Sequence, residues 1–230
     1  MLGRPIHTLL FDFGGTIDAD GLAWKERFHA CYQAEGLDMA EDAFAPVFYA
    51  ADDPLVGATG AELGLAETVT RLVANLESGL GADAARGRRV ATAFMDETGS
   101  TLQRNRPVLK ALAERYRLGI VSNFYGNLPA VCRGAEIDSL FGVIVDSEVV
   151  GARKPNPAIF QAALGPLRAA ADGAVMVGDS LHRDREGARQ AGMGFVWIAT
   201  DGAQQARAGR EGAADHPTVS SFDQLADLLL

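Results

Sequence analysis

Residues 9–16 read Leu9-Leu10-Phe11-Asp12-Phe13-Gly14-Gly15-Thr16, an apolar run that ends in an aspartate and two glycines. The run from Thr8 to Phe13 has the length and composition of a fully buried strand, and the glycines can form a tight turn after it. Asp12 therefore comes at the carboxyl end of a strand, the edge at which ligands bind in open α/β sheets. An aspartate in this place can also simply begin a turn, so the stretch alone leaves both roles open.

Length, composition and charge bound what the chain can do. Its 230 residues are 48% hydrophobic and 22% charged, enough for one large domain or two unequal ones. The formal charge of −9 argues against a nucleic-acid partner, which needs a basic surface. No apolar run approaches the roughly 20 residues of a membrane span, and no leader signature is present, so we expect no membrane partner and a cytoplasmic location. Cys31 and Cys132 are expected to be buried thiols rather than a disulfide.

The stretch of residues 20–100 predicts helices only, because the strand pattern disappears after Thr16. Apolar side chains recur there at helical spacing, in the sets Trp24, Phe28, Cys31, Tyr32; Phe44, Val47, Phe48; Leu65, Val69, Leu72, Val73, Leu76, Leu80; and Val90, Ala93, Phe94, Leu102. We expect a small helical bundle inserted after the first strand, with these side chains as its core.

From Asn105 onward helices and strands alternate. Strands are predicted at 118–121, 143–145, 174–177 and 195–198, and helices at 107–116, 128–133, 157–164, 183–191 and 222–229. This pattern predicts an α/β fold with a Rossmann-like parallel sheet that the first strand joins. Residues 1–19 and 101–230 would form this core domain and residues 20–100 a helical domain, while 202–214 reads as a surface loop or frayed helix.

Polar residues follow the predicted strands. They are Asp12, Ser122 with Asn123, Asp146 and Asp179, and Asp184 comes five residues after Asp179. The carboxyl ends of parallel strands meet at one edge, and carboxylates gathered there repel one another unless a cation lies between them. Oxygen ligands of this kind suit Mg²⁺. Lys154, between Gly151 and Pro155, adds a positive charge able to approach an anionic group beside that metal.

These segments together resemble the haloacid dehalogenase superfamily over nearly the whole chain. Asp12 to Thr16 resembles its nucleophile motif, Ser122-Asn123 its second motif, Lys154-Pro155 its third, and Gly178-Asp179 with Asp184 its fourth. The helical insert is similar to that family's cap domain of the first type. Four short motifs in the right order are far more specific than any one of them.

The resemblance implies a Mg²⁺-dependent phosphatase that acts on a small phosphorylated metabolite through a phosphorylated aspartate. Asp12 would attack phosphorus, Ser122 and Lys154 would bind the charge that develops, and Thr16 would hold the loop. The implied metal ligands are Asp12, the Gly14 carbonyl, Asp179 and Asp184. The implied substrate contacts are Asn123, Gly14 and Gly15, although Asn123 could instead cap a turn.

One position departs from the family pattern. Phosphatases of this family carry a second aspartate, the general acid and base, two residues after the nucleophile, and here that position is Gly14. Activity should then be slow, or limited to good leaving groups, unless another residue substitutes. The candidates are Asp18, Asp20 and His29, whose more ordinary roles are helix caps for the acids and a solvated helix face for the histidine.

Two other functional classes stay open. One is a hydrolase of carbon–halogen or carbon–phosphorus bonds; a dehalogenase needs no metal, and a phosphonate hydrolase would need a lysine such as Lys25 from the insert. The other is a binding or regulatory protein that has lost turnover. Arg86, Arg88 and Arg89 could contact a substrate anion from the insert. The pair Asp52-Asp53, near a loop tip of the insert, would disfavour a highly acidic substrate if it faces the site.

Overall fold

The computed structural model describes residues 5–200, 202 and 216–230. The segment expected as a loop or frayed helix at 202–214 therefore lies outside the described residues, apart from Gly202.

The centre of the fold is a six-stranded sheet, parallel throughout, in the order β3-β2-β1-β4-β5-β6. The strands are β1 (Thr8–Phe11), β2 (Arg117–Ser122), β3 (Val143–Asp146), β4 (Ala174–Gly178), β5 (Gly194–Ile198) and β6 (Thr218–Val219). The chain builds outward from β1 first on one side and then on the other, so the strand order reverses between β1 and β4. In such sheets the crevice at the carboxyl ends beside the reversal is where ligands bind. The predicted α/β class with a parallel sheet is confirmed.

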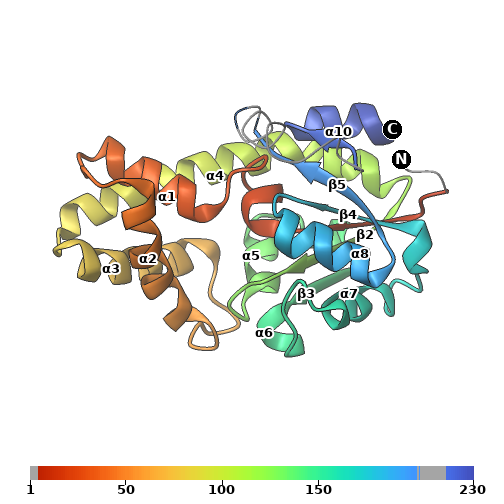
Figure 1. The fold of residues 1–230 in the computed structure, drawn as a ribbon, viewed down its shortest axis with the longest axis horizontal. Coiled ribbons are helices and arrows are strands. Elements are labelled where there is room, and N and C mark those ends of the chain that lie inside the picture. Colours follow the sequence, from red (N-terminus) through yellow and green to blue (C-terminus); the bar gives the residue numbers. More distant parts are fainter. Residues whose placement is uncertain (1–4, 201, 203–215) are drawn as a thin grey trace.

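Helices cover both faces of the sheet (Figure 1). Alternate side chains of the strands pack against them, in two separate cores. Leu9 and Phe11 belong to the core that includes α10 (Phe222–Leu229) and α5 (Leu128–Gly134), where the Phe11 and Phe222 rings stack with centroids 6.0 Å apart. Leu10 faces the other core, which includes α7 (Pro157–Leu164) and α8 (Glu186–Ala191). Burial on both faces explains why the first strand reads as a continuous apolar run.

Four helices lie between β1 and β2, as the sequence predicts: α1 (Trp24–Ala34), α2 (Glu41–Asp52), α3 (Leu65–Leu80) and α4 (Ala84–Ala113). They extend to one side of the sheet (Figure 1). Aromatic rings form their core, as expected; Phe28 and Phe94 stack with centroids 4.1 Å apart. The remaining short elements are α6 (Ser147–Val150), the turns Phe13–Ile17 and Leu181–Arg185, and the single turns Asp53–Leu55, Asp138–Leu140 and Ala171–Gly173.

The separate helix predicted at 107–116 is wrong. Ala84–Ala113 is one helix of 30 residues with Pro107 inside it. A proline in a helix interior costs roughly 3 kcal/mol, but the buried side chains of Asn105 and Leu109 anchor the helix on both sides of it. The Asn105 amide donates to the Ile17 carbonyl at 3.0 Å. Tertiary packing therefore outweighs the local preference.

Two smaller expectations also need correction. The helix predicted at 183–191 begins as the turn Leu181–Arg185 and becomes α8 only at Glu186. Cys132 is buried as expected, whereas Cys31 is half-buried; both are free thiols. Among the described residues, no helix combines the length and the apolar character that crossing a bilayer requires.

Candidate active site

The turn after β1 fixes the direction of the Asp12 carboxylate. Gly14 has φ −71° and ψ 120°, which any residue can adopt, but Gly15 has φ +87°. A Cβ on Gly15 would lie 2.7 Å from an oxygen of Asp179. Only glycine therefore allows this turn to pass so close to the end of β4.

Three carboxylates meet where the strand order reverses. Asp12 follows β1, Asp179 follows β4, and Asp184 lies in the turn Leu181–Arg185; one oxygen of each lies within 4.8 Å of the others. Burial, together with the charges of Asp12 and Asp184, holds the pKa of Asp179 well above its usual range. Burial likewise raises the pKa of Asp184, against the opposing charge of Lys154. Clustered carboxylate oxygens fit Mg²⁺, and a bound cation would relieve their repulsion.

Lys154 bridges two of these carboxylates. Its Nζ lies 2.8 Å from Asp12 Oδ1 and 2.7 Å from Asp184 Oδ1, and its side chain is fully buried. Burial lowers the pKa of Lys154, but the charges of Asp12 and Asp184 outweigh it, so the pKa is raised and the ammonium stays charged.

Asp12 is held through one of its two oxygens. Oδ1 accepts hydrogen bonds from Ser122 Oγ at 2.6 Å and from the Phe13 N–H at 2.8 Å, in addition to the Lys154 ion pair. No hydrogen bond found among the described residues ends on Oδ2. The arrangement fixes the carboxylate and leaves its second oxygen available as a nucleophile.

Thr16 and Asn123 contact the residues that form the site. Thr16 Oγ1 lies 3.5 Å from Asp179 Oδ1. Asn123 donates to the Lys154 carbonyl at 3.1 Å and accepts from the Lys154 N–H at 2.8 Å, so it aligns the lysine loop with the end of β2. Asp146 is paired in register with Ser122, but its carboxylate accepts three backbone N–H groups, those of Gly126, Leu128 and Glu148.

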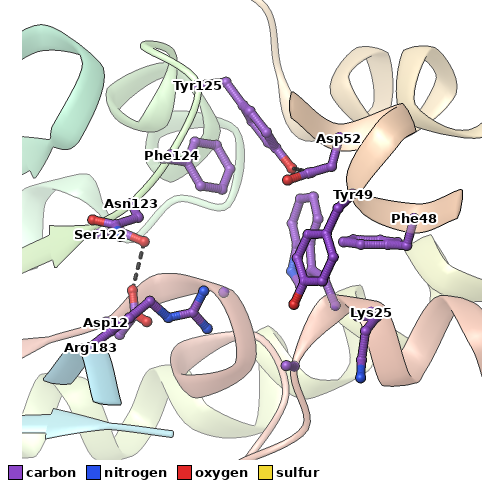
Figure 2. Close-up of a pocket in the computed structure, with 13 residues that line it drawn as sticks. Asp12, Lys25, Phe48, Tyr49, Asp52, Ser122, Asn123, Phe124, Tyr125 and Arg183 are labelled. Atoms are coloured by element: carbon purple, nitrogen blue, oxygen red, sulfur yellow. Dashed lines mark hydrogen bonds between the residues drawn. The ribbon is translucent and has the colours of Figure 1, made fainter. Parts of the chain in front are cut away.

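A pocket of about 100 Å³ opens beside Asp12, between the sheet edge and the helical insert (Figure 2). The insert and its lead-in contribute Ala23, Trp24, Lys25, Phe48, Tyr49 and Asp52; the sheet edge contributes Asp12, Gly14, Ser122, Asn123, Phe124, Tyr125 and Arg183. Gly15, Thr16, Lys154, Asp179 and Asp184 lie outside this lining. Pockets for drug-sized ligands measure roughly 300–1,000 Å³, so this pocket suits a small substrate.

None of the expected substitutes for an acid at position 14 lines the pocket. The Asp18 carboxylate is fully buried and accepts from Trp24 Nε1 at 2.7 Å and from Arg27 at 3.1 Å. Its pKa is raised by burial, against the lowering effect of the Arg27 charge. It also accepts the Gly15 N–H at 2.7 Å, so it braces the nucleophile turn instead of capping a helix.

Asp20 and His29 are engaged elsewhere. Asp20 accepts from Arg104 at 2.5 Å and from Asn105 at 2.9 Å, so it caps no helix either. His29 is buried, with Nε2 lying 2.7 Å from the Met39 carbonyl oxygen, and the expected solvated face is wrong.

Trp24 lies over Gly14. A Cβ added to Gly14 would lie 3.4 Å from Trp24 Nε1, which itself donates to Asp18. The sequence assigns Trp24 only to the helical core, and the structure shows that its indole is also a wall of the pocket.

The far wall of the pocket joins the insert to the sheet edge. The Tyr125 hydroxyl donates to Asp52 Oδ1. Burial raises the pKa of Asp52, against the lowering effect of this hydrogen bond, and burial with the Asp52 charge raises the pKa of Tyr125 well above its usual range. Asp52 thus faces the site, the condition under which a highly acidic substrate is disfavoured, whereas Asp53 is exposed and does not line the pocket.

Other cations of the insert differ in their access to the pocket. Lys25 lines it but pairs with Glu41 at 2.7 Å. Arg86 pairs with Glu77 and Arg89 with Glu35, while Arg88 is exposed, and none of the three arginines lines the pocket.

Sequence reasoning missed Arg183, Tyr49 and Tyr125 as lining residues. Arg183 could have been found, because it lies within the quoted segment between Asp179 and Asp184. The two tyrosines carry no such signal, since their positions depend on how the insert sits over the sheet.

The chain is similar to known proteins in its sequence and in its fold. Residues 6–192 match the family model of haloacid dehalogenase-like hydrolases. A glyceraldehyde 3-phosphate phosphatase of Pyrococcus abyssi is 41% identical over 96 residues, 40% of each chain. A phosphoserine phosphatase of Thermus thermophilus is 34% identical over 122 residues, 49% of this chain and 47% of that one. The matches thus span about half or less of these relatives.

The likeness in fold extends further than the likeness in sequence. The magnesium-bound structure of a HAD-hydrolase from Bacillus subtilis superposes with a TM-score of 0.57 at 18% identity, covering 98% of this chain and 99% of that one. This likeness concerns the fold alone. The family-model match covers most of the chain and includes Asp12, Ser122, Lys154 and Asp179. The chain therefore belongs to the haloacid dehalogenase-like hydrolases.

Proposed function

We propose that this hydrolase is a Mg²⁺-dependent phosphatase that forms a phosphorylated aspartate on Asp12. The observation that carries the proposal is the cluster of Asp12, Asp179 and Asp184 within 4.8 Å of one another, bridged by Lys154. A nucleophile, a hard-cation site and a buried ammonium in one place are what phosphoryl transfer needs.

The residues divide the reaction between them. Asp12 Oδ2 attacks phosphorus, the bond to the leaving oxygen breaks, and water then hydrolyses the acyl phosphate and restores the carboxylate. Ser122 and Lys154 hold the nucleophile and neutralise charge as the phosphoryl group transfers. Asp12, Asp179, Asp184 and the Gly14 carbonyl would hold Mg²⁺, which supplies electrostatic stabilisation of the phosphoryl oxygens when bound.

The helices of residues 20–100 act as a cap in this proposal. They supply six of the pocket-lining residues together with the segment that leads into α1, and the enclosed space is about 100 Å³. A pocket of this size favours a small phosphorylated metabolite. The activities named for the two phosphatase relatives, on glyceraldehyde 3-phosphate and phosphoserine, support that substrate class.

The three-carboxylate cluster also weighs against a dehalogenase. A carbon–halogen hydrolase of this family needs no metal, so Asp179 and Asp184 would have no purpose in it. Metal dependence of turnover separates the two activities.

The test is hydrolysis of a panel of small phosphate esters and acyl phosphates with Mg²⁺ and with a chelator. Turnover should require Mg²⁺. Asp179→Ala should lower both activity and the Mg²⁺ affinity measured by calorimetry, because it removes a charged ligand from the cluster.

The exposed Asp227 of α10 offers a matched control, since Asp227→Ala removes the same charge from outside the cluster and should leave both quantities unchanged. Unchanged Mg²⁺ binding in Asp179→Ala, or full turnover with the chelator, would rule out the proposed metal site.

A further inference from the structure

Arg183 places a positive charge in the pocket that the proposed mechanism does not use. It lies in the turn Leu181–Arg185 and lines the pocket together with Asp12 and Tyr49. Figure 2 shows its guanidinium directed away from the sheet edge, between Asp12 and the Tyr49 hydroxyl in this view. Within the described part of the chain, the guanidinium makes no ion pair and no hydrogen bond.

The balance of charge leaves Arg183 free for the substrate. Asp12, Asp179 and Asp184 would be compensated by Lys154 and one divalent cation. Across the pocket Asp52 is bound by the Tyr125 hydroxyl and forms no ion pair with Arg183 in the described part of the chain, so the Arg183 charge faces the space that a substrate would fill. A guanidinium stays protonated in proteins, so this charge persists.

The pocket lining next to Asp12 offers no carboxyl or imidazole group as a proton donor for a leaving group, and the hydroxyl of the exposed Tyr49 faces the Arg183 guanidinium (Figure 2). Gly14 has no side chain, Trp24 Nε1 is bound to Asp18, and Ser122 donates to Asp12. Lys25 is tied to Glu41, and Asp52 lies across the pocket with Tyr125 (Figure 2). The Arg183 guanidinium is the fixed cation that can meet negative charge on a departing oxygen without a transferred proton.

We propose that Arg183 is a catalytic residue that hydrogen-bonds the leaving-group oxygen, and that the preferred substrates are small acyl phosphates. This inference rests on the proposed function. The bond from Asp12 to phosphorus forms as the bond from phosphorus to the acyl oxygen breaks, and the electron pair leaves with that oxygen as a carboxylate. No proton is needed in this step. In the second step water attacks phosphorus, Asp12 is released, and the proton of the water passes to the phosphate product or the solvent.

Acetyl phosphate, a series of substituted phenyl phosphates and glycerol phosphate are the probes, each with Mg²⁺. The wild-type protein should favour acetyl phosphate over glycerol phosphate in kcat/KM. Arg183→Gln should lower kcat/KM by roughly 10- to 100-fold, the effect of one charge-assisted hydrogen bond. The loss should grow with the pKa of the phenol that departs, and Arg183→Lys should recover part of it.

A second arginine variant and a phosphate-binding measurement serve as controls for Arg183→Gln. Arg185→Gln removes the same charge from the same turn, at a side chain outside the pocket lining, and should keep the wild-type dependence on leaving group. Calorimetry with inorganic phosphate and Mg²⁺ should give the same affinity for Arg183→Gln as for the wild type, because Arg183 binds the departing oxygen and not the phosphoryl group. Thermal unfolding establishes that each variant is folded. If Arg183→Gln does not fold, the rates of Arg183→Lys with the same phenyl phosphates take its place, and a smaller loss that grows with the pKa of the phenol is expected.

The outcomes are distinct. A folded wild-type protein with no Mg²⁺-dependent turnover of any probe contradicts the proposed function itself. An active wild type with an Arg183→Gln variant that behaves like Arg185→Gln overturns the role of Arg183. A uniform loss across the phenyl series with weakened phosphate binding also overturns it, because Arg183 would then bind the phosphoryl group. Faster hydrolysis of glycerol phosphate than of acetyl phosphate overturns the substrate class.

Discussion

Gly14 and Gly15 differ in whether the backbone allows a side chain in their place. Gly15 has a positive φ and lies against Asp179, so its replacement would strain the turn. Gly14 has an ordinary φ, and a Cβ there would make van der Waals contact with Trp24 at 3.4 Å. The turn therefore does not require glycine at position 14, although this is the position where the family's phosphatases carry their second aspartate.

Gly14→Asp should raise the hydrolysis of poor leaving groups relative to good ones. A carboxyl at this position can protonate an alkoxide as it departs, an effect of roughly 10²–10⁴-fold at most for general acid catalysis. The measurement is the ratio of kcat/KM for glycerol phosphate to that for p-nitrophenyl phosphate, wild type against variant.

Gly14→Asn is the control, because it has nearly the same volume and cannot donate a carboxyl proton. The ratio should rise for the aspartate and not for the asparagine. An equal change in both variants, or none in a folded Mg²⁺-binding Gly14→Asp protein, would mean that another group already serves as the acid.

At the scale of elements, a buried ion pair ties the nucleophile turn to the helical insert. Asp18 follows the turn, Arg27 lies in α1, and Arg27 also donates to Thr98 of α4 at 2.6 Å. The side chains of Asp18 and Arg27 are 0% and 1% exposed. Removing one partner of such a pair leaves an uncompensated buried charge, which is far costlier than losing a surface pair.

Asp18→Asn should lower the free energy of unfolding by up to about 3–5 kcal/mol, because the buried Arg27 charge then keeps only the exposed carboxylate of Glu97, 3.3 Å away. Asp20→Asn is the comparison: its partner Arg104 is 51% exposed, and the loss should be about 0–1 kcal/mol. Urea unfolding of the two variants checks both values. Losses of equal size would show that the buried pair is no more important than the exposed one.

The elements that the sequence predicts correctly are those with a long apolar signal. The strand ending before Asp12 and the helical stripe of α3 have it. Strand β6 is only two residues long, too short for any periodicity, and it was not predicted. Pro107 suggested a helix start, but packing against Ile17 and the rest of the core carries α4 through it.

The same contrast holds in the site. Asp12, Ser122, Asp179 and Asp184 could be placed together from sequence, because the carboxyl ends of parallel strands share one edge. The pocket wall could not, because Tyr49 and Asp52 reach it only through the packing of α2 over that edge. The spacing of residues along the sequence does not predict that packing.

At the scale of the whole molecule, polar contacts close the insert onto the sheet edge. Tyr125 binds Asp52, and the Asn127 amide donates to the Leu63 carbonyl and to Thr68 Oγ1, at 2.8 Å each. Asp52 is the acid in this set whose pKa is raised by burial. Its ionisation therefore opposes the folded, closed arrangement.

Stability should fall with rising pH in the range that Asp52 controls. A carboxyl with a raised pKa binds its proton more tightly in the folded state than in the unfolded state, where the pKa is about 3.9. Its contribution is therefore complete below that value and is lost as the pH rises through the folded-state pKa.

The measurement is urea unfolding of the wild type and Asp52→Asn across this range. The wild type should lose stability relative to the variant as the pH rises, with the difference constant above the folded-state pKa. Asp96→Asn, at an exposed position of α4, should follow the wild type. If the stability of the wild type and that of Asp52→Asn change with pH in parallel, burial does not raise the pKa of Asp52.

The most direct test of the account is the site of phosphorylation. The protein is mixed briefly with Mg²⁺ and a phosphate compound that it hydrolyses, quenched with acid and reduced with borohydride. Mass spectrometry should then find homoserine at position 12, because borohydride reduces an aspartyl phosphate to homoserine. Asp12→Asn should show no such product and no more than a trace of turnover, because an amide cannot replace the carboxylate as nucleophile. Turnover by a folded Asp12→Asn protein, or a phosphorylated residue other than Asp12, would contradict the central claim.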